Sequence, residues 1–231
     1  MPSADLPLGP VVDPTPRPLP ARVPHRGKSV DLEPLHLRHV PELWQAAAAG
    51  TPEGDASWAY MGYGPFPSEA ALRNFVAGFA STHDPMAWAV RPHRTGTADG
   101  WLTLMDIQPG NAAIELGNIW FSPRMQRSRA ATEAMFLLMR HAMDDLGYRR
   151  LLWKCNACNA PSRRAAERLG FIYEGTLRAH MVVKGRWRDT AMFSILEDEW
   201  PARRTAIEAW LDDANFGPDG VARRPLQRVS P

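Results

Sequence analysis

The segment RMQRSRAATEAM, residues 124–135, joins a polar, arginine-rich turn to the beginning of an apolar helix. The first N–H groups of a helix lack intrahelical acceptors, so a turn of this kind is suited to binding phosphate. Phosphate-binding turns usually contain glycine, which lets the ligand approach the backbone closely. Arg129 stands where that glycine is expected. The segment is therefore either an anion-binding turn that carries a substitution or the ordinary start of a surface helix with solvated arginines.

A second candidate for chemistry is the pair Cys155 and Cys158, which lie in the run KCNACN. A zinc site needs about four ligands, and the chain has no other cysteines. A thioredoxin-type pair would open a helix, whereas Cys155 ends an apolar run. The seven histidines are scattered and show no metal-ligand spacing. We therefore expect thiols that line the core, and no metal.

Composition limits the classes of function. The chain has 231 residues, 45% of them hydrophobic, which is enough for one domain with extensions. A net charge of +2 does not call for nucleic acid or a membrane as a partner. No secretory signal and no apolar run of membrane-spanning length is visible. These observations predict a cytoplasmic protein.

The chain divides into three parts. Residues 1–29 contain eight prolines and predict an extended arm, residues 30–214 a single domain, and residues 215–231 a basic tail with Arg223, Arg224 and Arg228. Within the domain, alternating or continuous apolar runs predict strands over 29–35, 86–92, 99–108, 112–122, 149–157, 171–183 and 188–200. Helical spacing and caps predict helices over 36–49, 67–81, 132–147, 160–170 and 201–214.

This order of elements predicts an α/β (α+β) fold with a mixed, mostly antiparallel sheet flanked by helices. An antiparallel meander ends at the fourth strand, 112–122, and a helix then crosses to the fifth, 149–157. The crossover makes these two strands parallel neighbours. If they splay apart, the gap between them becomes a slot for a ligand.

Three motifs between Ile114 and Trp200 resemble the GNAT superfamily of acyl-CoA-dependent N-acetyltransferases, in particular its RimJ/RimL-like branch. The first is a strand ending in proline, followed by Q-x-x-R-x-A and T-E-A. The second is N-x-x-S on a short helix that closes in L-G-F. The third is E-G-x-x-R on a strand, followed by a hairpin that ends in E-W. The residues that carry them include Gln126, Ala131, Asn159, Ser162, Leu169, Gly170, Phe171, Glu174, Gly175, Arg178, Glu199 and Trp200.

The resemblance implies that acetyl-CoA binds as acyl donor, with no metal. The pantetheine would pair with main-chain groups of Ile119, Trp120 and Phe121, and the pyrophosphate would lie on the turn and first helical residues. The cofactor-binding residues implied are Ile119, Trp120, Phe121, Gln126, Arg127, Ser128, Arg129, Ala130, Ala131, Thr132 and Asn159. Arg129 departs from the family's usual Q/R-x-x-G-x-G/A pattern. If its φ stays negative, its side chain can point outward or its charge can reach a phosphate.

The resemblance also implies two catalytic residues. Glu115 lies four residues before the pantetheine-binding stretch, as the family's glutamate base does, and a strand places it on the same face as Gly117 and Ile119. The alternatives are a surface glutamate paired with an arginine, or Asp106 as the base. Many GNAT enzymes use a tyrosine acid where this chain has Ala166. Ser162 is the expected substitute, unless it only caps its helix.

The implied reaction is transfer of an acetyl group to a primary amine by direct attack in a ternary complex. Alternatives are another acyl group, such as succinyl, or a non-catalytic acyl-CoA-binding module. The acceptor, a small molecule or a peptide, is not specified by these residues, and a homodimer remains open.

Overall fold

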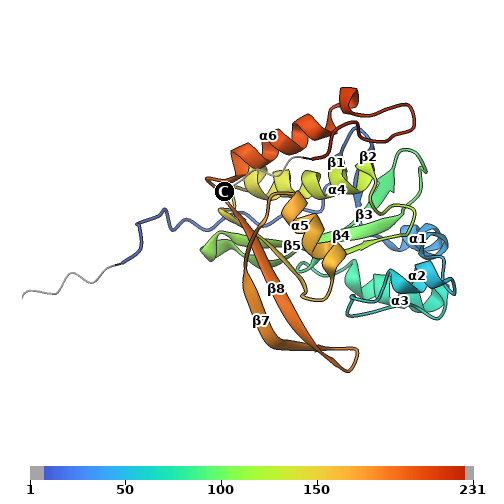
Figure 1. The fold of residues 1–231 in the computed structure, drawn as a ribbon. Coiled ribbons are helices and arrows are strands. Elements are labelled where there is room, and N and C mark those ends of the chain that lie inside the picture. Colours follow the sequence, from blue (N-terminus) through green and yellow to red (C-terminus); the bar gives the residue numbers. More distant parts are fainter. Residues whose placement is uncertain (1–7, 227–231) are drawn as a thin grey trace, which may run out of the picture.

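The computed structural model describes residues 8–226, and its frame is an eight-stranded sheet in the order β1-β2-β3-β4-β5-β6-β8-β7 (Figure 1). The strands are β1 (His25–Arg26), β2 (Val30–Pro34), β3 (Met86–Pro92), β4 (Gly100–Gln108), β5 (Ala113–Phe121), β6 (Arg150–Asn156), β7 (Ile172–Val183) and β8 (Arg186–Leu196). Only β5 and β6 are parallel neighbours; the other pairs are antiparallel. The predicted mixed, mostly antiparallel fold is confirmed.

Helices cover both faces of the sheet. One face carries α4 (Arg129–Arg140), α5 (Ala160–Arg168) and α6 (Trp200–Leu211); the other carries α1 (Val40–Ala47), α2 (Pro52–Ala56) and α3 (Glu69–Phe79) (Figure 1). Each face has its own apolar core. The α4 side is built from aliphatic and aromatic residues of α4, α6 and the strands. The α1–α3 side contains a cluster of aromatic rings around Trp58 and Trp101. Within residues 8–226, no helix is long and apolar enough to cross a membrane.

Two helix predictions needed correction. No helix was predicted between 49 and 67, yet α2 begins in the sequence GTPEGD, with Thr51 as N-cap accepting from Gly54 N and proline in the first turn. The long helix predicted over 132–147 begins earlier, at Arg129, and its last turn, His141–Asp145, is a π-helix. The N-cap predicted at Ser68 is confirmed, because its side chain accepts from Ala71 N.

The N-terminal segment is tied to the sheet through α4. The buried carboxylate of Glu133 accepts hydrogen bonds from Lys28 N (2.6 Å), Ser29 N (2.7 Å) and Ser29 Oγ (2.5 Å). The chain enters the sheet at β1, so the last residues of the expected arm include a strand. Residues 1–7 of that arm, and residues 227–231 of the expected tail with Arg228, lie outside the described residues.

Two bulges bend the middle of the sheet. Asp106 in β4 and Asn118 in β5 both have φ of +46°, and the β4–β5 register shifts by one residue at each. β5 pairs with β6 only through Ala113, Ile114 and Glu115, so it leaves its neighbour just before the second bulge. The predicted splay between the 112–122 and 149–157 strands is therefore confirmed. It lies between β5 and β6, since β1 adds a strand that the sequence did not predict.

Candidate active site

The gap between β5 and β6 exposes one edge of β5. Beyond Glu115, β5 remains paired with β4 on its other side, as Trp101 with Trp120 and Gly100 with Phe121. β6 meanwhile continues along β8, with Lys154 opposite Met192 and Asn156 opposite Thr190. The main-chain groups of residues 119–121 that face β6 therefore lie beyond the pairing of the two strands. An extended ligand could bond to them as an added strand would.

The Asn118 bulge reverses the faces of the residues that follow it. Ile119 and Phe121 pack with the core on the α4 side, whereas Trp120 belongs to the core of the α1–α3 side. The expectation that Ile119 shares a face with Glu115 is therefore wrong, because the extra residue shifts the two-residue alternation by one. The Trp120 ring stacks on Trp58 with centroids 4.2 Å apart, so only its backbone can meet a ligand. The core packing expected of Trp58, Trp88, Trp101 and Trp120 is confirmed.

The turn between β5 and α4 ends in a well-formed helix cap. Ser128 Oγ accepts from Ala131 N at 3.0 Å, and Ser128 O accepts from Thr132 N at 3.4 Å. The N–H groups of Arg129 and Ala130 precede these and have no acceptor within the helix, as at every helix start. The side chain of Gln126 braces the turn by donating to Phe121 O at 3.1 Å. This end of α4 thus presents two N–H groups and the positive end of its dipole toward the gap.

Arg127, not Arg129, takes the left-handed backbone conformation of the turn, with φ of +59°. The side chain of Arg129 runs away from the gap to the segment that follows α6. Its Nη2 donates to Leu211 O and to Asp213 Oδ1, both at 2.5 Å, and its guanidinium lies 4.3 Å from the centre of the Phe216 ring. Of the two geometries considered for this arginine, the outward one is found. The backbone of the turn remains available to an anion.

We expect Arg129→Gly to bind acetyl-CoA within about threefold of the parent, because the side chain makes its contacts with the C-terminal segment. The same change should lower stability by about 1–3 kcal/mol, through the lost charged hydrogen bonds and the added flexibility of glycine. Calorimetric titration with acetyl-CoA and urea unfolding measure the two effects. Arg129→Lys is the matched control for charge. A large loss of affinity in a glycine variant that is stably folded would show that the arginine itself holds the ligand.

Glu115 lies at the base of the gap and is almost completely buried. Its Oε2 forms an ion pair with Lys154 Nζ at 2.9 Å, and the same Nζ contacts Asp106 Oδ2 at 2.6 Å. The side chain of Glu115 covers Gly117, where an added Cβ would come within 2.8 Å of Glu115 Oε1. The surface glutamate paired with an arginine, considered from the sequence, is not what is found. The two carboxylates proposed as rival bases share one ammonium group.

The pKa values of the three groups differ in direction. Burial raises the pKa of Glu115 above its usual value, and the positive charge of Lys154 opposes that rise. The hydrogen bond from Lys154 lowers the pKa of Asp106, with help from Gln108. Burial acts to lower the pKa of Lys154, but its bonds to Asp106 and Glu115 outweigh burial and raise it. Glu115 is therefore the better proton acceptor of the two carboxylates.

Ser162 and Asn159 begin α5 on the far side of the gap. Asn159, not Ser162, caps the helix: its Oδ1 accepts from Ser162 N at 3.1 Å. The hydroxyl of Ser162 instead accepts from Trp153 Nε1 at 3.1 Å. That contact uses a lone pair of the hydroxyl, which also forms a hydrogen bond with the side chain of Cys155. Cys155 is buried as expected, but Cys158 is exposed, because the chain leaves the sheet after Asn156.

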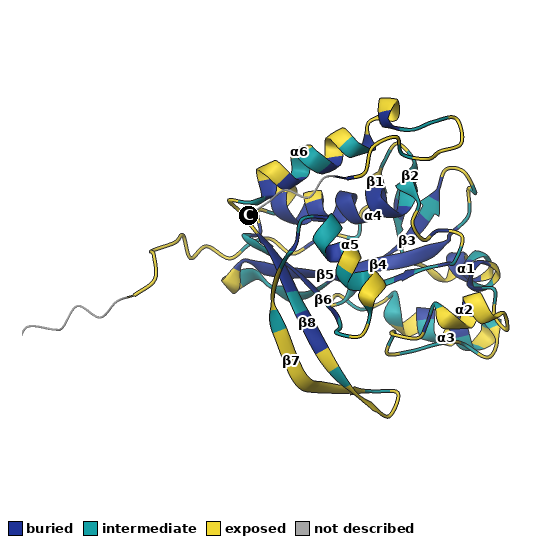
Figure 2. Cartoon of the chain, in the orientation of Figure 1, coloured by how far each residue is buried: buried dark blue, intermediate teal, exposed yellow. Residues whose placement is uncertain are grey.

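Two parts of the chain project on the side of the sheet that carries Glu115. The β7–β8 hairpin and the α2–α3 segment both extend from this side, and most of β7 is exposed (Figure 2). They meet where Lys184 Nζ, at the tip of the hairpin, donates to Trp58 O at 2.9 Å. The α2–α3 segment also contacts the loop between β6 and α5, where Tyr60 OH donates to Cys158 O at 3.1 Å.

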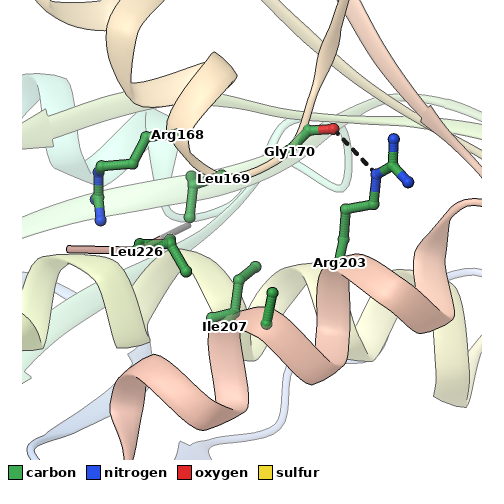
Figure 3. A pocket seen from close by; sticks show the side chains of 7 residues that line it. Arg168, Leu169, Gly170, Arg203, Ile207 and Leu226 are labelled. Atoms are coloured by element: carbon green, nitrogen blue, oxygen red, sulfur yellow. Dashed lines mark hydrogen bonds between the residues drawn. The ribbon is translucent and has the colours of Figure 1, made fainter. Parts of the chain in front are cut away.

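A separate hollow between α5 and α6 is lined by residues that include Arg168, Gly170, Arg203 and Leu226 (Figure 3). Arg203 Nε donates to Gly170 O at 3.4 Å across it. None of the predicted site residues lines this hollow, so it belongs to the packing of α6 and not to the chemistry. Among residues 8–226, no cluster of three or more histidine, cysteine, aspartate or glutamate side chains is placed to hold a metal ion.

The structure adds to the candidate site one residue that was not predicted from the sequence. Lys154 was noted only as part of the KCNACN run, yet it connects Glu115 of β5 with Asp106 of β4. A signal was present: a lysine within an otherwise apolar strand, RRLLWKCNA, on the neighbour of the strand that carries Glu115. A charged residue inside a buried strand usually has a charged partner.

Comparison with known proteins identifies the family of the chain. Residues 29–172 match the family model described as "Acetyltransferase (GNAT) domain". A crystal structure of a GCN5-related N-acetyltransferase from Brucella melitensis is 43% identical, with a TM-score of 0.89, and the match covers 92% of this chain and 96% of that one. A probable acetyltransferase of the GNAT family from Chromobacterium violaceum ATCC 12472 is 38% identical, with a TM-score of 0.77, over 85% of this chain and 98% of that one.

The protein named "Putative ribosomal N-acetyltransferase YdaF", from Bacillus subtilis (strain 168), is 28% identical over 109 residues, 47% of this chain and 59% of that protein. The chain therefore spans less than two thirds of this curated relative. Its name agrees with the RimJ/RimL-like branch expected from the motifs. The family model covers more than half of the chain and coincides with the splayed strands and the turn before α4. The chain belongs to the GNAT family of acetyltransferases.

Proposed function

We propose that the protein transfers an acetyl group from acetyl-CoA to a primary amine, by direct attack of the amine within a ternary complex. The observation that carries the proposal is the gap between β5 and β6 with the buried carboxylate of Glu115 at its base. A free strand edge and a helix N-terminus lie on one side of that carboxylate. The β7–β8 hairpin and the α2–α3 segment lie on the other. The two substrates would reach the same point from opposite sides.

On the α4 side, the pantetheine would lie along the free edge of residues 119–121 and bond to its main-chain groups. The pyrophosphate would lie at the start of α4, on the N–H groups of Arg129 and Ala130. Ser128 supports that position because its hydroxyl fixes the first turn of the helix. Arg127 also lies in this turn and has no ion pair among residues 8–226. Asn159 would approach the donor from α5.

On the opposite side, the amine would enter between the β7–β8 hairpin and the α2–α3 segment. Glu115 would accept its proton, directly or through a water molecule, before the nitrogen attacks the thioester carbonyl. Main-chain N–H groups of β5 would stabilise the oxyanion. Ser162 would give its proton to the departing thiolate and regain one from the nitrogen as the tetrahedral intermediate collapses to the amide. The hydrogen bond from Trp153 Nε1 would keep its hydroxyl in place.

The acceptor is proposed as a peptide or small-molecule amine. The name of YdaF suggests a ribosomal protein for that relative, and a protein N-terminus is accordingly one acceptor to test here. A larger acyl group such as succinyl is the second candidate, because the positive charge of Arg188 on β8 acts on Glu115 and could meet a second carboxylate. A cytoplasmic location and a homodimer are proposals that follow the family alone.

Release of CoA thiol, followed with a panel of amines, tests the proposed reaction. The panel contains peptides with free N-termini, lysine-containing peptides, polyamines and aminoglycosides, and each is run with acetyl-CoA and with succinyl-CoA. We expect amine-dependent release of thiol with acetyl-CoA, and a product heavier by one acetyl group in mass spectrometry. Thiol release that is the same with every amine and with none would show only thioester hydrolysis. That result would contradict the proposed transfer.

A further inference from the structure

The charges around Glu115 come from four strands. Lys154 of β6 and Asp106 of β4 lie in the contacts described above, and Arg188 of β8 acts on Glu115 from further along the same face. His180 of β7 is held on this face by Thr190, with Nδ1 and Oγ1 3.0 Å apart. Only Lys154 touches the Glu115 carboxylate. Its ammonium is the one positive charge in contact with this carboxylate among residues 8–226.

The position of Asp106 is itself fixed by the fold. Asp106 occupies the β4 bulge with its backbone in the left-handed region. Asp84 holds that bulge from the preceding turn, because one of its oxygens accepts from Asp106 N at 2.9 Å and the other from Ile107 N at 3.0 Å. Gln108 Nε2 donates to the second oxygen of Asp106 at 2.8 Å. These bonds aim the Asp106 carboxylate at Lys154 and keep the ammonium group at the gap.

The exposed fraction of the side chain decreases from Asp106 through Lys154 to Glu115. The side chain of Asp106 is 37% exposed, that of Lys154 is 22% exposed and that of Glu115 is 6% exposed. A carboxylate as buried as Glu115 would bind a proton and lose its use as a base unless a positive charge touched it. The half-exposed Asp106 therefore holds the ammonium of Lys154 against the buried carboxylate of Glu115. Removing Lys154 would leave Glu115 without its compensating charge.

We propose that Lys154 is a positioning residue that keeps Glu115 ionised; this rests on the proposed role of Glu115 as base. Asp106 holds the Lys154 ammonium in place, and its negative charge competes with that of Glu115 for the ammonium. Lys154 takes no proton in the reaction and touches no substrate. Its effect is on the pH at which the enzyme becomes active. The two neighbours of Glu115 should therefore shift that pH in opposite directions.

The test is the pH profile of kcat/KM with one amine acceptor, so that the titration of the amine itself is common to all variants. Glu115 must lose its proton to act, so activity falls as the pH drops through its pKa. In Lys154→Met the acid limb should move to higher pH by about one unit or more, with activity returning at alkaline pH. In Asp106→Asn it should move to lower pH by less than a unit. Lys154→Arg, which keeps the charge, should restore most of the parent profile.

The outcomes separate three possibilities. If Lys154→Met lowers kcat equally at every pH and leaves the limb in place, Lys154 is only structural and the inference is overturned. An upward shift in Asp106→Asn overturns the assignment of Asp106. If Glu115→Gln keeps the parent's acid limb, Glu115 is not the base and the proposed mechanism fails as well. Acetyl-CoA titration shows whether each variant is folded, and Asp106→Asn tests the inference even if Lys154→Met does not fold.

Discussion

Replacing Glu115 with glutamine is expected to lower kcat by about 10- to 1000-fold, the usual effect of losing a general base. Glutamine has nearly the same shape but cannot accept the proton of the amine. Affinity for acetyl-CoA should stay near that of the parent, because the donor lies along the edge of residues 119–121 and at the start of α4. Steady-state kinetics at saturating acetyl-CoA, with calorimetric titration of the donor, measure both quantities.

A matched control for Glu115 is Glu174→Gln. Glu174 is also a carboxylate of the sheet, but it pairs with Arg150 at 2.7 Å and 2.5 Å, away from the gap. We expect that variant to keep the turnover of the parent. If Glu115→Gln turns over as fast as the parent across the pH range, the base is Asp106 or solvent, and the proposed role of Glu115 is wrong.

The second large effect is on stability. Trp120→Ala should lower the free energy of unfolding by about 3–5 kcal/mol, the range for removing a large aromatic side chain from a core. The ring stacks on Trp58 at 4.2 Å and lies 4.7 Å from Trp101, and its Nε1 donates to Ser57 Oγ at 3.0 Å. Urea unfolding followed by circular dichroism measures the change.

Trp187→Ala is the control for loss of a tryptophan. Its side chain is exposed on the β7–β8 hairpin, so its removal should change the free energy of unfolding by no more than about 0.5 kcal/mol. Trp120→Phe keeps an aromatic ring in the core and should retain the affinity of the parent for acetyl-CoA. Loss of binding in a folded Trp120→Phe variant would mean that the indole touches the donor, contrary to the backbone contact proposed for residue 120.

Much of the fold follows from short-range signals. The meander, the crossover and the helix stops are set by apolar periodicity and by caps such as Ser68, which are local properties of the chain. The splay between β5 and β6 followed from the order of elements and from the family's motifs. The bulge at Asn118 did not: asparagine adopts the left-handed conformation more readily than most residues, but it does so in only a small fraction of cases. It decides which of Ile119 and Trp120 faces the aromatic core.

The missed parts of the site depend on contacts between distant segments. Lys154 contacts Glu115 and Asp106 because three strands bring these residues together. The residue pattern of a single strand does not predict such a contact. The contact between Arg129 and Asp213 was even less predictable, because the two residues lie 84 positions apart along the chain. Residue types and spacing located the candidate groups. The charges that tune them come from the tertiary fold.

Arginine at position 129 has a consequence for how this chain can change over time. The substitution at the turn is accommodated by an acidic and an aromatic residue beyond the last helix, Asp213 and Phe216. If glycine returned at 129, those two residues would lose the cation they hold. If they were lost, the guanidinium, 20% exposed, would keep Leu211 O as its remaining hydrogen-bond partner. The ligand turn and the C-terminal segment are thus subject to a single selective constraint, and in homologous chains these positions are expected to vary together.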